Sequence, residues 1–298
     1  MADNPELERY TKACNRASST VISAYSTSFS TAVRLLGARH RAHVRNIYAL
    51  VRVADELVDG VGSEAGLTLA DQRRQLDELE QQTYQALEFG YCSNPVVHAF
   101  AITARACGID RPVVQPFFAS MRSDLAFTEP PSGPVTTLSH AEHSAYVYGS
   151  AEVVGLMCVR VFLREENRSD EAMREVEHGA RMLGAAFQNI NFLRDLADDS
   201  VRLHRDYLGA RTQLTEDEKA AWLTRIRGEL AEARNTLHLL PKDARLAVRC
   251  ALELFRALAA RIERAPAPEL YRRRIRVPNW QKLFIAARAS AHTALERA

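Results

Sequence analysis

Nearly every segment of this 298-residue chain repeats its apolar residues at intervals of three to four, the period of one face of an α-helix. The sustained alternation that marks β-strands is hard to find. Clear examples of the helical period are Val44-Ile47-Tyr48-Val51-Ala54-Val58 and Leu246-Cys250-Leu254-Leu258. Glycine and proline interrupt the pattern at 60–66, 89–95, 128–134, 209–215 and 265–268. The pattern therefore predicts an all-α fold of about ten helices.

Two of the predicted helices carry a row of polar residues on one face, ending in two acids four residues apart. The first acid stripe consists of Tyr48, Arg52, Asp55 and Asp59. The second acid stripe consists of Gln188, Asn191, Asp195 and Asp199. Like charges four residues apart destabilise an isolated helix by roughly 0.2–0.5 kcal/mol per pair, so a cation cluster is the natural compensation. We expect the two helices to face each other, so that the four carboxylates meet.

The organisation of the chain favours one domain over residues 1–298. None of the predicted loops is long or polar enough to be a linker between domains, and the two acid stripes make chemical sense only in a shared cavity. The sequences around the stripes show no repeat of fixed period, which argues against a solenoid. We therefore predict a closed helical bundle with a central apolar cavity and polar groups at one mouth.

The residue types in the stripes indicate a magnesium diphosphate site. Magnesium prefers hard oxygen ligands and is commonly held by carboxylates together with substrate phosphates. The predicted metal ligands are Asp55, Asp59, Asn191, Asp195 and Asp199, with Mn²⁺ as an alternative ion. Guanidinium and amide groups suit phosphate oxygens, which makes Arg52, Arg194 and Gln188 diphosphate-binding candidates. Arg205 and Tyr207 follow the second stripe and are placed to close over a bound diphosphate.

A metal-bound diphosphate is a good leaving group, because the metal draws charge onto it while an allylic carbon–oxygen bond ionises. The resulting cation must be kept dry, and aromatic faces stabilise cations by up to about 2 kcal/mol when desolvated. Most aromatic residues near the stripes are expected in the core. Tyr146 is the catalytic candidate, because its hydroxyl can also assist proton movement in an apolar pocket. The predicted catalytic set is Tyr146, Asp55, Asp59, Asp195 and Asp199.

The charge balance excludes some classes of partner. The chain has 39 basic and 37 acidic residues, so it lacks the overall positive field expected of a nucleic-acid-binding protein. Its five cysteines are scattered and form no C-x-x-C pair, which suits reduced thiols in the cytoplasm. The N-terminal residues lack the pattern of a signal peptide, and Glu152 and Arg160 interrupt the most apolar stretch, so no membrane span is expected.

A peripheral membrane contact stays open at this point. A basic run near the C-terminus, Arg272, Arg273, Arg274 and Arg276, can meet anionic lipid headgroups. A solvated basic start of a helix explains the same run equally well.

Several blocks of the sequence resemble motifs of the squalene and phytoene synthase family. The family's S-x-S-F element corresponds to Ser26-Thr27-Ser28-Phe29, and its Y-A-x-x-R-x-x-D-x-x-x-D block to Tyr48-Ala49 through Asp59. The block Gly184 to Asp195, followed by Asp199, is similar to G-x-A-x-Q-x-x-N-x-x-R-D-x-x-x-D. Looser matches are Tyr146 to Gly155, where Glu152 replaces a glycine, Arg205 to Gly209, and Arg274 to Lys282.

The resemblance implies an isoprenoid-synthase fold that condenses two prenyl diphosphates through a cyclopropylcarbinyl diphosphate. It implies that the metal ligands are those named above, that Ser26, Arg52, Gln188 and Arg205 orient diphosphate, and that the substrate site also includes Ser28, Tyr48, Arg194, Tyr207 and Arg274. We favour phytoene synthase, which joins two geranylgeranyl diphosphates without NADPH. A squalene, dehydrosqualene or presqualene diphosphate synthase, acting on farnesyl diphosphate with or without NADPH, is the alternative.

Other functional classes fit the sequence less well. Gly60 to Gly66 misses the spacing of a dinucleotide-binding loop, and no strand precedes it. His140 and His143 have helical spacing but no third metal ligand nearby, so they receive no role. A noncatalytic lipid-binding or assembly factor has no need of four carboxylates, Asn191 and two arginines in register. The intact stripes therefore favour an enzyme.

Overall fold

The computed structural model describes residues 4–26, 32–127, 138–202, 207–208 and 213–295, and these contain thirteen α-helices and no strand. The α-helices are α1 (Pro5–Tyr25), α3 (Ala38–Asp59), α4 (Val61–Glu64), α5 (Leu69–Phe89), α6 (Pro95–Cys107), α7 (Arg111–Phe127), α8 (His140–Val147), α9 (Val153–Leu163), α10 (Asp170–Arg202), α11 (Glu216–Asn235), α12 (Lys242–Arg264), α13 (Ala267–Leu270) and α14 (Asn279–Leu295). A π-helix, η1 (Tyr148–Glu152), joins α8 to α9, and a 3-10 turn, η2 (Leu237–Leu239), follows α11. The all-α prediction is confirmed.

The helix ends follow the predicted breaks where the structure describes them. α3, α5 and α12 end at Asp59, Phe89 and Arg264, at the starts of three glycine- or proline-containing breaks. The break at 128–134 lies outside the described residues. The predicted number of helices was too low, because the sequence pattern does not resolve one-turn helices such as α4, which lies inside the first break, and α13, which begins inside the last one.

Side-chain caps fix where several helices begin. Thr68, Ser139 and Thr215 each accept a hydrogen bond from the backbone three residues later, and the acid at that position bonds back to the cap. Such reciprocal capping boxes satisfy backbone groups that a helix leaves unpaired at its start. The cap at Ser139 sets the register of α8, which carries Tyr146.

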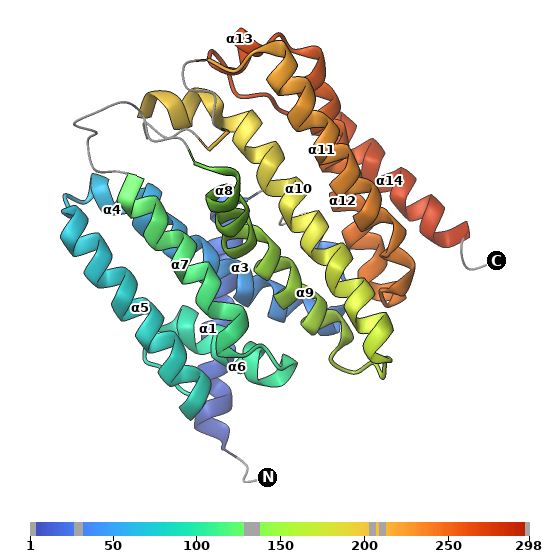
Figure 1. Cartoon of the computed structure of the whole chain (residues 1–298). Coiled ribbons are helices and arrows are strands. Elements are labelled where there is room, and N and C mark those ends of the chain that lie inside the picture. The colour runs from blue at the N-terminus through green and yellow to red at the C-terminus, as the bar shows by residue number, and fades with distance from the viewer. Residues whose placement is uncertain (1–3, 27–31, 128–137, 203–206, 209–212, 296–298) are drawn as a thin grey trace.

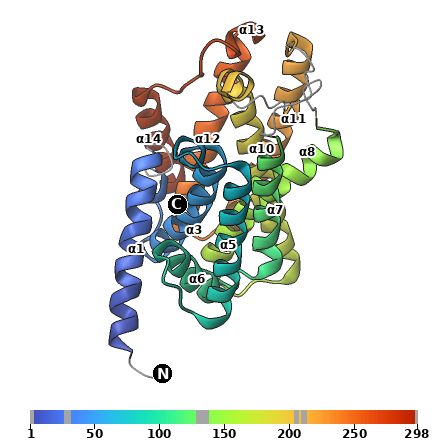
Figure 2. The ribbon, with the colours of Figure 1, turned by 90° about the vertical axis from the view of Figure 1, so that its left-hand side faces the viewer.

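The helices pack as a slanting bundle in which α5 and α7 form one flank and α11, α12 and α14 the other, with α8 and α9 between them (Figure 1). α9 contacts α3, α7 and α10, so it is the central helix that separates the two stripe-bearing helices. Turned by 90°, the bundle shows α13 at one end and the N-terminus at the opposite end (Figure 2). Buried apolar residues from Ile22 to Val277 form one continuous core cluster.

The unit formed by α8, η1 and α9, His140–Leu163, is long and apolar enough to cross a membrane by length and composition alone. The charged residues Glu152 and Arg160, from which no membrane span was expected, lie within this stretch. Within the protein, 56% of its most apolar 18 residues is buried. Glu152 is itself buried and paired with Arg181, whose Nε lies 2.7 Å from Oε2.

The junction between α8 and η1 lies against α7 at a glycine. A Cβ on Gly149 would come within 2.2 Å of the Pro116 carbonyl oxygen and the Ser120 hydroxyl. That hydroxyl donates a 3.1 Å hydrogen bond to the carbonyl of Tyr146. The close approach of η1 to α7 therefore positions the backbone of Tyr146.

We expect Gly149→Ala to lower the free energy of unfolding by about 1–3 kcal/mol, because the backbone of α7 cannot move away from the added methyl group. Gly228→Ala is the matched control, since Gly228 lies in α11 with open space around its Cα. Alanine favours a helix over glycine by about 1 kcal/mol, so this control should be as stable as the wild type or more stable. Urea unfolding of both variants checks the prediction. Equal stability of the two variants would contradict the tight contact.

Candidate functional site

The first acid stripe runs along the C-terminal half of α3. Apolar residues of this helix, including Ile47, Leu50 and Ala54, face the core, which leaves the stripe half-buried at their side. Arg52 Nη1 lies 2.5 Å from Asp55 Oδ2 and 3.2 Å from Glu56 Oε1. Burial alone would lower the pKa of the Arg52 guanidinium, but Asp55 and Tyr48 outweigh it and raise that pKa.

The second acid stripe lies on α10, and its clearest polar contact is at Asp195. Arg194 donates to both carboxylate oxygens, Nε to Oδ1 at 2.9 Å and Nη2 to Oδ2 at 2.5 Å. Arg274, 79 residues further along the chain, also reaches Asp195, with Nε 2.7 Å from Oδ1. The structure thus brings three of the predicted site residues together. Two guanidinium groups on one carboxylate form a pair of cationic forks that diphosphate oxygens can also occupy.

Asn191 carries the most direct sign of a missing partner. Its side-chain oxygen is buried and has no hydrogen-bond partner among the described residues. Leaving a buried acceptor unsatisfied costs about 1–3 kcal/mol, so such a group needs an explanation. A neutral amide oxygen one turn from Asp195 is a suitable ligand for a hard cation. The Asn191 side-chain oxygen is therefore chemically suited to be one ligand of a magnesium ion.

The carboxylates themselves are not gathered into one cluster. Among the described side chains, no three His, Cys, Asp or Glu residues lie close enough together to hold a metal ion. Asp55 and Asp195 are instead each held by arginine. The side chain of Asp199 lies outside the described residues, so the full ligand set stays a prediction.

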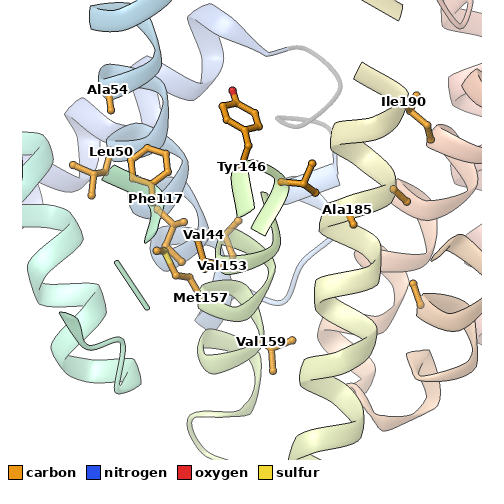
Figure 3. Packing of buried hydrophobic residues seen from close by; sticks show 14 of the residues in the cluster. Val44, Leu50, Ala54, Phe117, Tyr146, Val153, Met157, Val159, Ala185 and Ile190 are labelled. Carbon is orange, nitrogen blue, oxygen red and sulfur yellow. The ribbon is translucent and has the colours of Figure 1, made fainter. Parts of the chain in front are cut away.

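Tyr146 stands between the two stripe-bearing helices. Figure 3 shows its ring between Leu50 and Ala54 of α3 and Ala185 and Ile190 of α10, with the hydroxyl pointing away from the apolar cluster. The charge of Asp59 is near enough to contribute to the raised pKa of Tyr146, and the ring of Phe192 lies 6.0 Å from that of Tyr146. The side chain of Tyr146 thus lies near the end of the first stripe and near the ring of Phe192 on α10.

The hydroxyl of Tyr146 belongs to a buried network centred on Asp124 of α7. Tyr146 donates to Oδ2 at 2.9 Å, and Tyr207 donates to Oδ1 at 2.7 Å. Asp124 is 1% exposed, and the ring of Tyr207 stacks on Phe192 with centroids 4.5 Å apart. Burial, with the charges of Asp124 and Tyr207, raises the pKa of Tyr146 well above its ordinary value, so the phenol stays protonated.

Asp124 and Glu56 are the polar site residues that the sequence analysis missed. Asp124 lies in α7 between the buried residues Met121 and Leu125, so a lone acid on an otherwise apolar helix face was the available signal. Glu56 lies beside the first stripe and shares Arg52 with Asp55. Both residues add negative charge near the predicted diphosphate site.

The remaining predicted site residues are placed less fully. Gln188 and Tyr48 are half-buried on their helices, and Ser26 follows the last residue of α1. Ser28 and Arg205 lie outside the described residues. Neither of two surface cavities, of about 820 and 640 Å³, lies between the stripes, because they are lined by α5–α7 and by α11, α12 and α14. The central apolar cavity therefore stays a prediction.

His143, one turn before Tyr146, is buried with neither ring nitrogen hydrogen-bonded within the described part of the chain. Its ring lies 4.9 Å from that of Trp222 and 5.8 Å from that of Phe192. Burial lowers the pKa of His143 from 6.5 to about 4, with a smaller effect from Arg225. The aromatic wall beside Tyr146 thus contains a neutral imidazole.

This depressed pKa predicts a pH dependence of stability. As pH falls from 6.5 towards 4, the unfolded chain binds a proton at His143 that the folded chain excludes, so folding is progressively disfavoured. At pH 4 this proton uptake by the unfolded chain lowers the free energy of unfolding by about 3 kcal/mol. We expect His143→Phe to lose less stability than the wild type over this range, as measured by urea unfolding. His140→Phe, on the exposed side of the same helix, is the control and should keep the wild-type slope. If the free energy of unfolding fell equally with pH in the wild type and in His143→Phe, the lowered pKa of His143 would be contradicted.

Comparison with known proteins gives consistent matches. The family model for squalene/phytoene synthase matches residues 22–281. A 15-cis-phytoene synthase of Paracoccus sp. is 31% identical over 275 residues, covering 87% of this chain and 84% of that protein. A phytoene synthase of Pseudescherichia vulneris is 28% identical over 262 residues, covering 80% of this chain and 79% of that protein. A dehydrosqualene synthase crystal structure shares the fold, with a TM-score of 0.70 and 20% identity over 98% of this chain and 99% of that one.

Proposed function

Because the chain belongs to the squalene/phytoene synthase family, a family of prenyltransferase-type enzymes, we propose that it condenses two geranylgeranyl diphosphates into phytoene. Relatives that align over most of both chains are phytoene synthases, which supports the C20 substrate. The observation that carries the chemistry is the placement of Tyr146 between two helices that each present acid and arginine side chains.

We assign the metal to the two stripes. Asp55 and Asp59 would hold it on α3, and Asn191, Asp195 and Asp199 would hold it on α10. When bound, Mg²⁺ would supply the positive charge that stabilises a leaving diphosphate. Arg52, Arg194 and Arg274 would orient the diphosphate oxygens, exchanging their present carboxylate partners for it.

The reaction proceeds by two ionisations. The first breaks the bond between C1 and diphosphate in one substrate, the allylic cation adds to the double bond of the second, and loss of a proton closes a cyclopropane ring. The second releases the remaining diphosphate, and rearrangement with loss of another proton gives the hydrocarbon. The buried rings of Tyr146, Phe192 and Tyr207 would exclude water from these cations and stabilise them by cation–π contact. Neither of these two steps consumes a reductant, so NADPH is not required.

Product analysis by mass spectrometry tests this proposal. Purified protein is incubated with Mg²⁺ and either geranylgeranyl or farnesyl diphosphate, with and without NADPH. We expect phytoene from the C20 substrate without NADPH, and two diphosphates released per product. A C30 product alone would assign the chain to the farnesyl diphosphate branch. Absence of both product and diphosphate release would favour the noncatalytic alternative.

We propose a cytoplasmic location, which five free thiols support. A hydrocarbon product of this size is insoluble in water, so its release calls for contact with an apolar phase.

A further inference from the structure

The C-terminal helix α14 presents an apolar stripe to solvent. Trp280, Leu283 and Phe284 are 69%, 73% and 63% exposed, and they are among the most exposed large apolar side chains of the described residues. Together with the exposed Ala287 they occupy positions i, i+3, i+4 and i+7, which lie on one helix face. We call these four residues the α14 stripe. A contiguous apolar stripe of this kind marks an interaction surface.

The opposite face of α14 is fixed to α12. Ala289 is buried, Arg261 Nε donates to Gln281 Oε1 at 3.0 Å, and Arg249 Nη1 donates to Thr293 Oγ1 at 3.0 Å. In Figure 1 α14 lies on the outer flank of the bundle, beyond α12. The helix therefore has one face in the protein and presents the α14 stripe outward, although Phe284 also lines the cavity between α11, α12 and α14.

The sequence around the α14 stripe is strongly basic. Residues 270–295 contain six basic residues and no acidic residue, although the whole chain carries only a net charge of +2. The six are Arg272, Arg273, Arg274, Arg276, Lys282 and Arg288. Arg272 and Arg276 are exposed just before the helix begins. An apolar stripe bordered by positive charge complements a surface that is both anionic and apolar.

We propose that α14 docks this protein on an anionic lipid bilayer, with the α14 stripe inserted at the interface and the exposed Arg272 and Arg276 on the headgroups, whereas Arg273 and Arg274 pair with Glu269 and Asp195. Tryptophan and phenylalanine suit this depth, and basic residues near such a surface are attracted to its negative charge. A second copy of the chain fits less well, because pairing two α14 stripes would bring the two basic segments together. The docking does not depend on the proposed function.

The placement also links the surface to the candidate site. Arg274, which contacts Asp195, lies six residues before Trp280. The segment 271–278 therefore runs from the second acid stripe to the start of α14. The basic segment that contacts Asp195 is therefore continuous in sequence with the helix that carries the α14 stripe.

Vesicle sedimentation tests the proposal with the full chain. We expect the wild type to bind phosphatidylcholine vesicles containing phosphatidylglycerol at least tenfold more tightly than vesicles of phosphatidylcholine alone, with binding weakened by salt. The triple variant Trp280→Gln/Leu283→Gln/Phe284→Gln should lose at least tenfold in affinity. The control Leu7→Gln/Phe89→Gln removes exposed apolar groups on α1 and α5, 40% and 73% exposed, and should bind as the wild type does. Thermal melting establishes that each variant is folded.

Two further readouts make the test decisive. The chain has only two tryptophans, so in Trp222→Phe protein the emission of Trp280 should shift to the blue on anionic vesicles. Light scattering reports the oligomeric state of the wild type and the triple variant. Failure of the wild type to bind anionic vesicles, or equal binding by the triple variant, would overturn the proposal. A wild-type dimer that the triple variant converts to monomer would assign the α14 stripe to self-association instead.

Discussion

Asp195→Asn is expected to lower the rate of diphosphate release by about 10²- to 10³-fold while leaving the protein folded, because the substitution removes the charge that holds a cation and keeps the shape of the side chain. Asp195 is 19% exposed and meets Arg194 and Arg274 at the surface of the site. The amide oxygen of asparagine can still accept one hydrogen bond from each arginine, whereas its NH2 group cannot accept the other two. Steady-state assays of diphosphate release at saturating Mg²⁺, with melting curves of the same samples, check both parts of the prediction.

The matched control for this variant is Glu175→Gln, which makes the same chemical change on the exposed side of the same helix. It should keep both wild-type activity and wild-type melting temperature. Activity of Asp195→Asn within a few fold of the wild type would remove Asp195 from the metal site. Unfolding of the variant would show that the carboxylate serves the structure instead.

The second large effect is expected at Asp124. Asp124→Ala should lower the free energy of unfolding by about 2–6 kcal/mol, because two buried phenol groups each lose their acceptor at a cost of about 1–3 kcal/mol. The hydroxyls of Tyr146 and Tyr207 lie 2.9 and 2.7 Å from the carboxylate oxygens that would be removed. Urea unfolding of the variant and of the wild type measures the difference.

A mutant cycle separates the hydrogen bonds from the loss of packing. In a background of Tyr146→Phe and Tyr207→Phe, no phenol remains to be left unpaired, so Asp124→Ala should cost much less there than in the wild type. The same cost in both backgrounds would show that the network contributes little. The double phenylalanine variant should also lose prenyl-transfer activity if the Tyr146 hydroxyl acts on protons in the site.

The parts of the site that the sequence predicted are those with a local signature. Helices α3 and α10 repeat their apolar residues with a helical period, and the acids follow the same period, so a single helix suffices to place them on one face. The resemblance named Arg274 as a site residue, but only the structure shows that Arg274 contacts Asp195, 79 residues earlier. The match of spacing to helix geometry explains why the stripes were found from sequence.

The parts that were missed depend on contacts between distant segments. Asp124 is a single acid without a repeating pattern, and its partners are 22 and 83 residues away. The π-helix η1 and the close approach at Gly149 also depend on the packing of α7 against η1, which no local pattern encodes. Tertiary packing, not helix propensity, decides these features.

The departure at Glu152 shows how the protein accommodates an acid where the family pattern has glycine. The carboxylate is buried, but Arg181 of α10 pairs with it, and the Arg181 guanidinium lies 5.3 Å from the centre of the Tyr148 ring. A buried charge is tolerated when it is paired in this way. The substitution therefore adds a link between η1 and α10 beside the candidate site.

If the two acid stripes together hold one metal–diphosphate complex, residues of both α3 and α10 must bind the metal. Crystals grown with Mn²⁺ and an unreactive thiolodiphosphate analogue of the prenyl substrate test it through the anomalous scattering of manganese. We predict anomalous peaks bonded to Asp55 or Asp59 on α3 and to Asn191 or Asp195 on α10, with the diphosphate between them. Manganese bound elsewhere, or no manganese while Asp55 and Asp195 keep their arginine partners, would contradict the account.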